Sequence, residues 1–190
     1  MKTDYQWHSS CSPRWTQHNN TFEFYLKKGT PGECLNDDKP LEGVYEFKER
    51  QEVRTDKLEP GTYVWKADVE TISDELIHAS CFHLFQIHDG RIGGRPPHCI
   101  QVRDGDIVLC NQDEEVITSE YKGKLSIITK ISIKKESITV GYVFDGKYIG
   151  TMKAETRDSP IVKFGAYRWN AVCDVKQVYN NVKFGRKDVS

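Results

Sequence analysis

The chain has no long apolar run and no sustained helical periodicity. None of its stretches approaches the ~20 apolar residues that a membrane-spanning helix needs. The first residues, Met1 to Trp7, lack the apolar segment of a signal peptide. This start fits an intracellular protein, or one whose leader was replaced by a methionine. We expect no membrane partner.

An excess of charge of one sign is also lacking, because acids and bases are interspersed and the formal net charge is −1. Bulk positive charge therefore does not predict a nucleic-acid partner, although a local basic groove for an acidic ligand is compatible with these numbers. The six cysteines form no Cys-x-x-Cys pair, which argues against zinc-ribbon and thioredoxin-like sites. A strand-to-helix Gly-x-Gly-x-x-Gly loop for nucleotides is absent too.

Most of the chain consists of short runs rich in Val, Ile, Tyr, Phe and Thr, broken by Gly, Asp, Asn and Pro. This pattern predicts an all-β protein, an antiparallel β-sandwich of the jelly-roll type with little helix. We expect a single domain over 1–190, with 1–20 as an N-terminal arm. The one helix candidate lies near 73–79, where a loop explains the sequence equally well.

Two hairpins can be aligned from the sequence. Asp104-Gly105 is a two-residue turn signal, and counting outward from it places Val102 opposite Ile107 and Cys99 opposite Cys110. The cysteine pair is the best candidate for a disulfide, although two packed free thiols are an alternative. Residues 125–152 predict an antiparallel meander that turns near 134–137 and again at Asp145-Gly146.

Charged side chains alternate along residues 49–54. The period of two in a strand places Arg50, Glu52 and Arg54 on one face, and three charges in a row cannot face an apolar core. A solvated outer face explains this pattern. So does an anion-binding strand in which Glu52 holds the two guanidinium groups.

Two later segments also place polar side chains on one face. Gln86 and His88 share a face, opposite to their apolar neighbours, although a lone histidine in a strand is usually structural. In 161–169, one face carries Lys163, Gly165, Tyr167 and Trp169. A glycine inside a strand weakens it unless something approaches the backbone, so either a bulge or a ligand lying across Gly165 explains its presence.

In this order and at these intervals, the three segments resemble the signature strands of alginate-lyase-type polysaccharide lyases of the family-seven kind. Residues Arg50-Gln51-Glu52-Val53-Arg54 resemble the Arg-Ser/Thr-Glu-Leu-Arg strand, and Gln86-Ile87-His88 matches the Gln-Ile/Val-His motif. Lys163-Phe164-Gly165-Ala166-Tyr167 resembles the Lys-Ala-Gly-x-Tyr core. Together with Arg168, which follows it, this segment also resembles the corresponding strand of jelly-roll lyases that act on glucuronan or heparin-type polymers. The likeness covers roughly residues 20–186.

The resemblance implies a secreted or periplasmic monomer with a concanavalin-like jelly roll. It implies cleavage of a 4-linked uronic-acid polymer, such as alginate or glucuronan, by β-elimination without a metal or other cofactor. Such an elimination removes the C5 proton, stabilises the resulting charge and protonates the O4 leaving group. The implied catalytic roles are charge neutralisation by Arg50 and Gln86, a base in His88, and an acid, or both acid and base, in Tyr167.

The same resemblance implies a set of substrate-binding side chains. They are Arg54, Glu52, Lys163, Arg91, Arg95 and Trp169. Arg91 and Arg95 belong to a glycine-rich loop that directly follows His88, and such a loop suits a lid over a polyanionic chain.

Two other functions fit a β-sandwich of this length. A non-catalytic carbohydrate-binding module would need charges and aromatic platforms, but not the combination of Gln86, His88 and Tyr167. A structural or capsid-like jelly roll would show a large interface between copies. A metal site built from histidines is not expected, because on a regular strand His83 and His88 face opposite ways.

Overall fold

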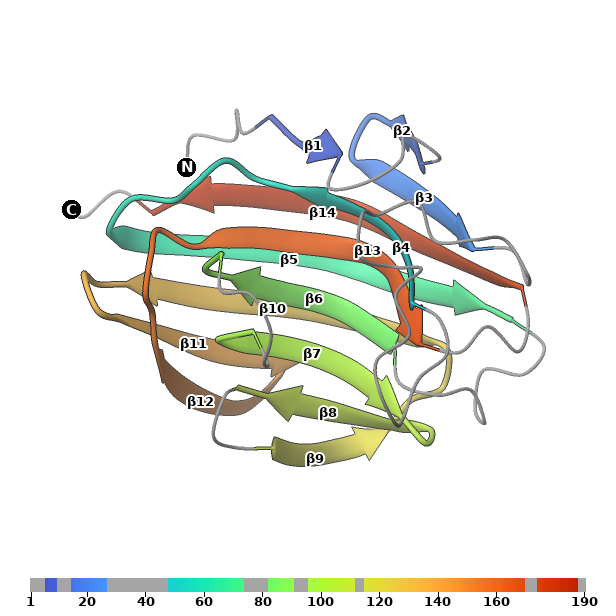
Figure 1. Ribbon diagram of the computed structural model, residues 1–190. Coiled ribbons are helices and arrows are strands. Elements are labelled where there is room, and N and C mark those ends of the chain that lie inside the picture. Colours follow the sequence, from blue (N-terminus) through green and yellow to red (C-terminus); the bar gives the residue numbers. More distant parts are fainter. Residues whose placement is uncertain are drawn as a thin grey trace.

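The computed structural model describes residues 6–9, 15–26, 48–73, 82–90, 96–111, 115–169 and 174–187. Of residues 48–50 and 168–169 it describes the backbone alone. Two antiparallel sheets of seven strands each are stacked face to face, which confirms the predicted β-sandwich (Figure 1). Within these ranges no helix is long and apolar enough to cross a membrane.

The front sheet carries the three polar segments. Its order is β1 (His8–Ser9), β4 (Lys48–Arg54), β13 (Ile161–Trp169), β6 (Phe82–His88), β7 (His98–Arg103), β8 (Asp106–Cys110) and β9 (Glu115–Glu120). In Figure 1 this sheet lies nearer to the viewer, with β6, β7 and β8 in front of the other layer. We call the face that points away from the second sheet the outer face.

The back sheet closes the sandwich. Its order is β12 (Lys147–Glu155), β11 (Ser137–Phe144), β10 (Lys124–Ile133), β5 (Gly61–Ile72), β14 (Val175–Arg186), β3 (Thr21–Leu26) and β2 (Trp15–His18). Along β10, every second side chain from Leu125 to Ile133 is buried, as the sequence predicted. This alternation is expected for a strand with one face on the core and one on solvent.

Both predicted Asp-Gly turns are present. Asp104 and Gly105 have φ angles of 50° and 85°, and Asp145 and Gly146 have 48° and 79°. Such pairs of positive φ angles match the right-handed twist of the flanking strands. The resulting register places Cys99 opposite Cys110, and the two form a disulfide with their Cα atoms 5.2 Å apart. The predicted pairing is therefore confirmed.

Aromatic side chains fill the space between the sheets. Trp65 on β5 packs on Phe85 of β6 and Phe164 of β13, with ring centroids 4.6 and 5.6 Å away. Tyr179 on β14 lies 4.9 Å from Phe164 and is wholly buried. Because these rings come from both sheets, they fix the position of β6 and β13 relative to the back layer.

The N-terminal segment takes part in both sheets. β1 pairs with β4, and β2 pairs with β3. Trp7 packs against Phe164 with ring centroids 4.8 Å apart. The described part of the expected arm thus contributes edge strands. Most of the helix candidate at 73–79 lies outside the described residues.

Candidate functional site

The three polar segments lie side by side on the front sheet. β13 has β4 on one side and β6 on the other, all antiparallel. Lys163 sits between Arg54 and Gln86, and Tyr167 lies opposite Arg50. Side chains from strands that the sequence separates by more than a hundred residues therefore share the outer face.

A hydrogen bond crosses the middle of this face. Gln86 of β6 donates from Nε2 to Oε1 of Glu52 on β4, although β13 lies between the two strands. Neighbouring strands are about 4.8 Å apart, so the two side chains meet above β13. Gly165, which pairs with Glu52, has no side chain to obstruct this contact. Glu52 is 1% exposed even though it points away from the core.

Gly165 marks a β-bulge. The register between β13 and β6 shifts between Phe164 and Tyr167, and Gly165 has a φ of 143°. A Cβ at this position would lie 2.8 Å from the Cα of Glu52, and closer still to the carbonyl oxygen of Gln51. The approach of β4 therefore explains this glycine, as the bulge interpretation proposed.

A second bulge lies in β6. The register between β6 and β7 shifts between His83 and Phe85, so Leu84 is an extra residue in its strand. His83 consequently lies on the outer face together with Gln86, although the two are three positions apart. The prediction that His83 faces the opposite way from His88 was wrong, because it assumed a regular strand.

Tyr179 holds the two bulges from the back sheet. Its hydroxyl lies 2.8 Å from the carbonyl oxygen of Leu84 and 2.9 Å from that of Gly165. Burial raises the pKa of Tyr179 well above its ordinary value, so the hydroxyl keeps its proton and can donate it. The side chain also contacts Oε1 of Gln177, at 3.2 Å.

The bulges bring His83 to Tyr167. The two residues are direct partners across β6 and β13, and their rings stack with centroids 4.6 Å apart and an interplanar angle of 19°. Both side chains are largely buried, with 3% of His83 and 8% of Tyr167 exposed. His83 Nε2 lies 3.0 Å from the amide nitrogen of Gln101 on β7. Neither His83 nor Gln101 was among the predicted site residues.

His88 lies at the other end of β6. It pairs with Ile161, six positions along β13 from Tyr167, which corresponds to roughly 20 Å at the rise of a β-strand. Its Nδ1 accepts a hydrogen bond from the backbone N–H of Gly90, at 3.0 Å. The structure therefore does not bring His88 and Tyr167 together.

The structure describes the side chains of only some of the remaining predicted residues. Arg54 and Lys163 are half-buried partners across β4 and β13, and Arg54 donates to the carbonyl oxygen of Thr55 at 3.4 Å. Arg50 and Trp169 are described by their backbone alone. Arg91 and Arg95 lie outside the described residues.

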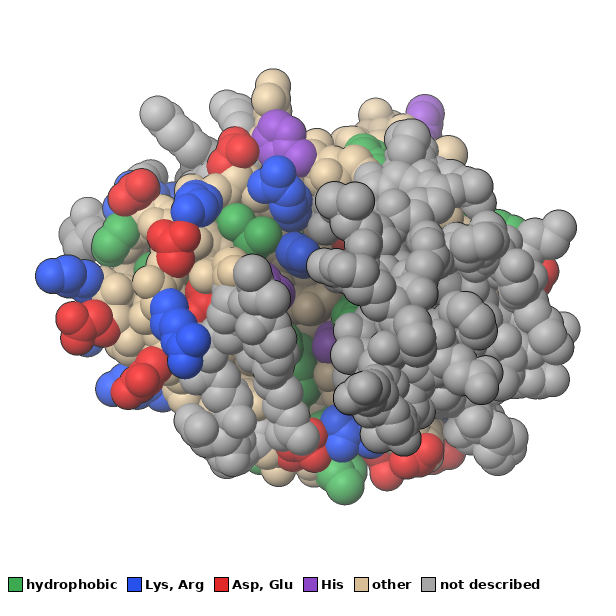
Figure 2. Space-filling model, viewed as in Figure 1, with side chains coloured by type: hydrophobic (Ala, Val, Ile, Leu, Met, Phe, Trp, Pro, Cys, Tyr) green, Lys and Arg blue, Asp and Glu red, His purple; other side chains and the backbone are tan. Residues whose placement is uncertain are grey.

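The described residues contain no group of three or more His, Cys, Asp or Glu side chains that could hold a metal ion. His98 points into the sandwich, where its Nε2 lies 3.1 Å from the carbonyl oxygen of Ile138. In the space-filling view, histidine and basic side chains are visible near the middle of the front sheet (Figure 2).

No protein-family model and no curated protein matches the sequence. Solved structures do match the fold. The alginate lyase AlgAT5 of polysaccharide lyase family 7 aligns over 93% of this chain and 84% of its own, with 15% identity and a TM-score of 0.61. An alginate lyase from Corynebacterium sp. aligns over 94% and 83%, with 15% identity and a TM-score of 0.60. The family 18 polysaccharide lyase aly-SJ02 aligns over 96% and 95%, with 12% identity and a TM-score of 0.62.

Proposed function

We propose that a protein with this alginate-lyase fold is itself a polysaccharide lyase, which cleaves a 4-linked uronic-acid polymer by β-elimination without a metal. The observation that carries the proposal is the stacked pair of Tyr167 and His83, which lies on the same three adjacent strands as the Glu52 carboxylate that holds Gln86. A phenol, an imidazole and an amide on one buried patch are the groups that this elimination requires.

The chemistry divides among these side chains. The substrate carboxylate is neutralised by Arg50 and by the second N–H of the Gln86 amide, whose first N–H is held by Glu52. Neutralising the carboxylate makes the C5 proton more acidic, and Tyr167, whose ring stacks on His83, takes that proton. Tyr167 then protonates O4 as the C4–O4 bond breaks and the C4–C5 double bond forms.

Other polar groups of the outer face hold the rest of the polymer. Arg54 and Lys163 form a basic pair toward the end of β4, and His88 lies on the same side of the sheet, away from Tyr167. Arg91, Arg95 and Trp169 complete the proposed set of substrate-binding residues. The solved complex of the alginate lyase AlyC3 with dimannuronate aligns over 90% of this chain, with 11% identity and a TM-score of 0.63, which supports an acidic oligosaccharide as the ligand class.

The Cys99–Cys110 disulfide supports a secreted or periplasmic location, because disulfides persist in oxidising compartments. A polymer substrate outside the cell is consistent with such a location.

The proposal is tested with a panel of alginate, glucuronan and glycosaminoglycans. Elimination creates an unsaturated uronide, whose ultraviolet absorbance rises with time. We expect a rise with at least one polymer, and a fall in kcat of about 10²–10⁴-fold for Tyr167→Phe and for His83→Ala, the size of an acid–base contribution. Absence of a rise across the panel at varied pH and salt would contradict the proposal.

His88→Ala is the matched control for His83→Ala, because it removes the same side chain from the same strand. We expect it to change KM more than kcat. If His88→Ala abolishes turnover and His83→Ala does not, the base is His88, as the motif alone suggested.

A carbohydrate-binding module remains the second candidate function. The observation in its favour is that this chain aligns over 96% of its length with only 17% of a sialidase chain, at 11% identity and a TM-score of 0.60. The same sandwich therefore also occurs as a small part of a larger enzyme. Affinity for an acidic polysaccharide that survives Tyr167→Phe, with no product formed by the unaltered protein, would select this function.

A further inference from the structure

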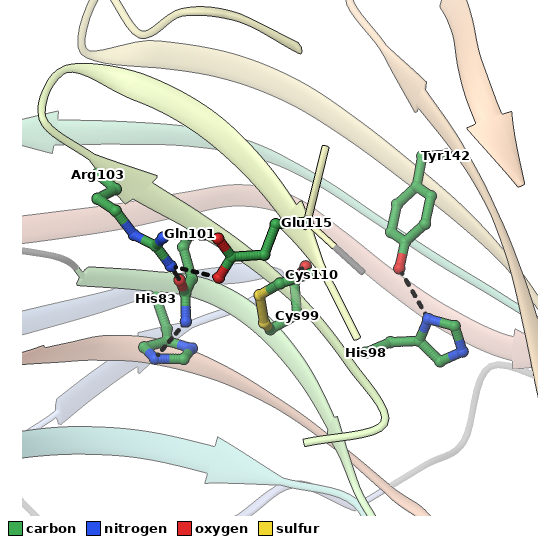
Figure 3. Close-up of a disulfide and its surroundings, with 8 residues drawn as sticks. All are labelled: His83, His98, Cys99, Gln101, Arg103, Cys110, Glu115 and Tyr142. Carbon is green, nitrogen blue, oxygen red and sulfur yellow. Dashed lines mark hydrogen bonds and ion pairs between the residues drawn. A yellow bond between two sulfur atoms is a disulfide. The ribbon is translucent and has the colours of Figure 1, made fainter. Parts of the chain in front are cut away.

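A chain of hydrogen bonds runs over the outer face from β9 to β6 (Figure 3). Glu115 accepts two hydrogen bonds from the guanidinium group of Arg103, at 2.9 and 3.0 Å. Arg103 also donates to Oε1 of Gln101, at 2.9 Å. Nε2 of Gln101 then lies 3.0 Å from Nε2 of His83, whose ring stacks on Tyr167.

The chemistry of these groups decides which atom donates and which accepts in each of these hydrogen bonds. A guanidinium group can only donate, so the amide group that faces Arg103 must be the oxygen of Gln101. The NH₂ group therefore faces His83, and it too can only donate. Nε2 of His83 must offer a lone pair to accept this bond, so the ring proton of the neutral imidazole lies on Nδ1. A protonated ring would set two N–H groups against each other.

We propose that Gln101 and Arg103 are positioning residues that hold His83 as the neutral Nδ1–H tautomer beside Tyr167. Glu115 fixes Arg103, and through Arg103 it fixes the rotation of the Gln101 amide. The significance of this tautomer for catalysis rests on the proposed lyase function. With its Nε2 lone pair engaged, His83 does not take the C5 proton at that atom, and Tyr167 makes both proton transfers.

Tyr167 alone accounts for both proton transfers. Tyr167 enters the cycle as a phenolate that has given its own proton to solvent, and it takes the proton from C5. The C4–O4 bond breaks as the C4–C5 double bond forms, and the phenol returns the same proton to O4, which restores the phenolate. The neutral His83 ring stays unchanged through these steps. The positive charge needed at the substrate carboxylate then comes from Arg50 rather than from the imidazole.

The buried His98 provides a built-in reference. Its Nε2 faces the carbonyl oxygen of Ile138 at 3.1 Å, and its Nδ1 lies 3.1 Å from the hydroxyl of Tyr142. A carbonyl can only accept, so His98 carries its proton on Nε2. The two buried histidines are therefore expected to be opposite tautomers in the same molecule.

The test is long-range ¹H–¹⁵N NMR of the full-length protein with ¹⁵N-labelled histidine, which separates protonated from unprotonated ring nitrogens. His83→Gln and His98→Gln identify the two sets of signals. We expect His83 to show a protonated Nδ1 and an unprotonated Nε2, and His98 to show the reverse. A protonated Nε2 on His83 would overturn the proposal.

Gln101→Glu reverses the polarity of the last bond, because a carboxylate accepts where the amide donated. We expect the Nε2 signal of His83 to become that of a protonated nitrogen, while the His98 signals stay in place. Gln17→Glu is the matched control, because Gln17 lies in the other sheet. Its side chain donates a hydrogen bond to the backbone of Asn19, in the turn between β2 and β3. This variant should leave both histidines unchanged.

Activity provides the second readout. On a polymer that the wild type cleaves, Gln101→Glu should lower kcat by about 10²-fold or more, with KM changed far less. A reversed tautomer with an unchanged kcat would overturn the positioning role. If the wild type cleaves no polymer, the lyase function fails, while the NMR spectrum still decides whether Gln101 and Arg103 set the tautomer.

Discussion

The Tyr179 hydroxyl offers a direct way to test how the two bulges are held. Tyr179→Phe removes one oxygen from a side chain that is 0% exposed and leaves its aromatic packing on Phe164 intact. Two carbonyl oxygens, those of Leu84 and Gly165, converge on this hydroxyl from strands of the opposite sheet.

The expected loss follows from the number of protons involved. A hydroxyl has one proton to donate, so the substitution deprives one buried carbonyl of that donor. Leaving a buried acceptor unsatisfied costs about 1–3 kcal/mol. We therefore expect the free energy of unfolding to fall by about 2 kcal/mol, because the compensating gain from removing a buried hydroxyl is smaller.

The assay is urea-induced unfolding, followed by tryptophan fluorescence, with the shift in midpoint converted through the slope. Tyr142→Phe is the control, because its hydroxyl is also buried and bonds to His98 rather than to a bulge. Both variants should lose stability. Only Tyr179→Phe should also alter the His83 ring signals, since only Tyr179 touches the bulge next to His83. An unchanged midpoint for Tyr179→Phe, or equal His83 signals in both variants, would refute this reasoning.

Three further predictions concern stability. Burial lowers the pKa of His98 from 6.5 to about 4, so between these two pH values the unfolded chain binds a proton that the folded chain does not. The free energy of unfolding should therefore fall by up to roughly 3 kcal/mol as the pH drops from 6.5 to 4. His98→Gln should flatten this pH dependence in urea titrations. Gly165→Ala should cost at least ~3 kcal/mol because its Cβ would meet the backbone of β4. At Gly146 φ is +79°, and an added Cβ would meet no atom beyond its chain neighbours within 4 Å, so Gly146→Ala should cost only about 1–2 kcal/mol. Equal thermal shifts for the two glycine variants would contradict the clash. Replacing Cys99 and Cys110 together by serine should lower the free energy of unfolding by ~2–3 kcal/mol, and mass spectrometry that finds both wild-type thiols free would contradict the pairing.

The regular parts of the sandwich could be predicted from local patterns. The period of two along β10 and the Asp-Gly turns are short-range signals, and together they set the register that joins Cys99 to Cys110. The adjacency of β4, β13 and β6 is a long-range property, which the sequence conveyed only through a family likeness. Sequence periodicity assigns faces within a strand and says nothing about which strands are neighbours.

The position of His83 was missed because a bulge changes the parity of a strand. In His83-Leu84-Phe85-Gln86, two adjacent apolar residues separate two polar ones, and this break in the alternation was the available signal. The pairing of Arg103 with Glu115 could not be predicted, since it depends on the register between β8 and β9. The backbone of Gly165 was recognised as unusual, but the sequence left its cause open.

The bulges at Leu84 and Gly165 have a consequence for comparing this chain with others. Each bulge acts as a one-residue insertion inside a strand, a place where alignment procedures rarely open a gap. A gapless comparison of β6 with a strand that lacks the bulge would keep Gln86-Ile87-His88 in phase and shift His83 by one position. Distant relatives of this chain should therefore be aligned by strand pairing, starting from the residue that faces Tyr167.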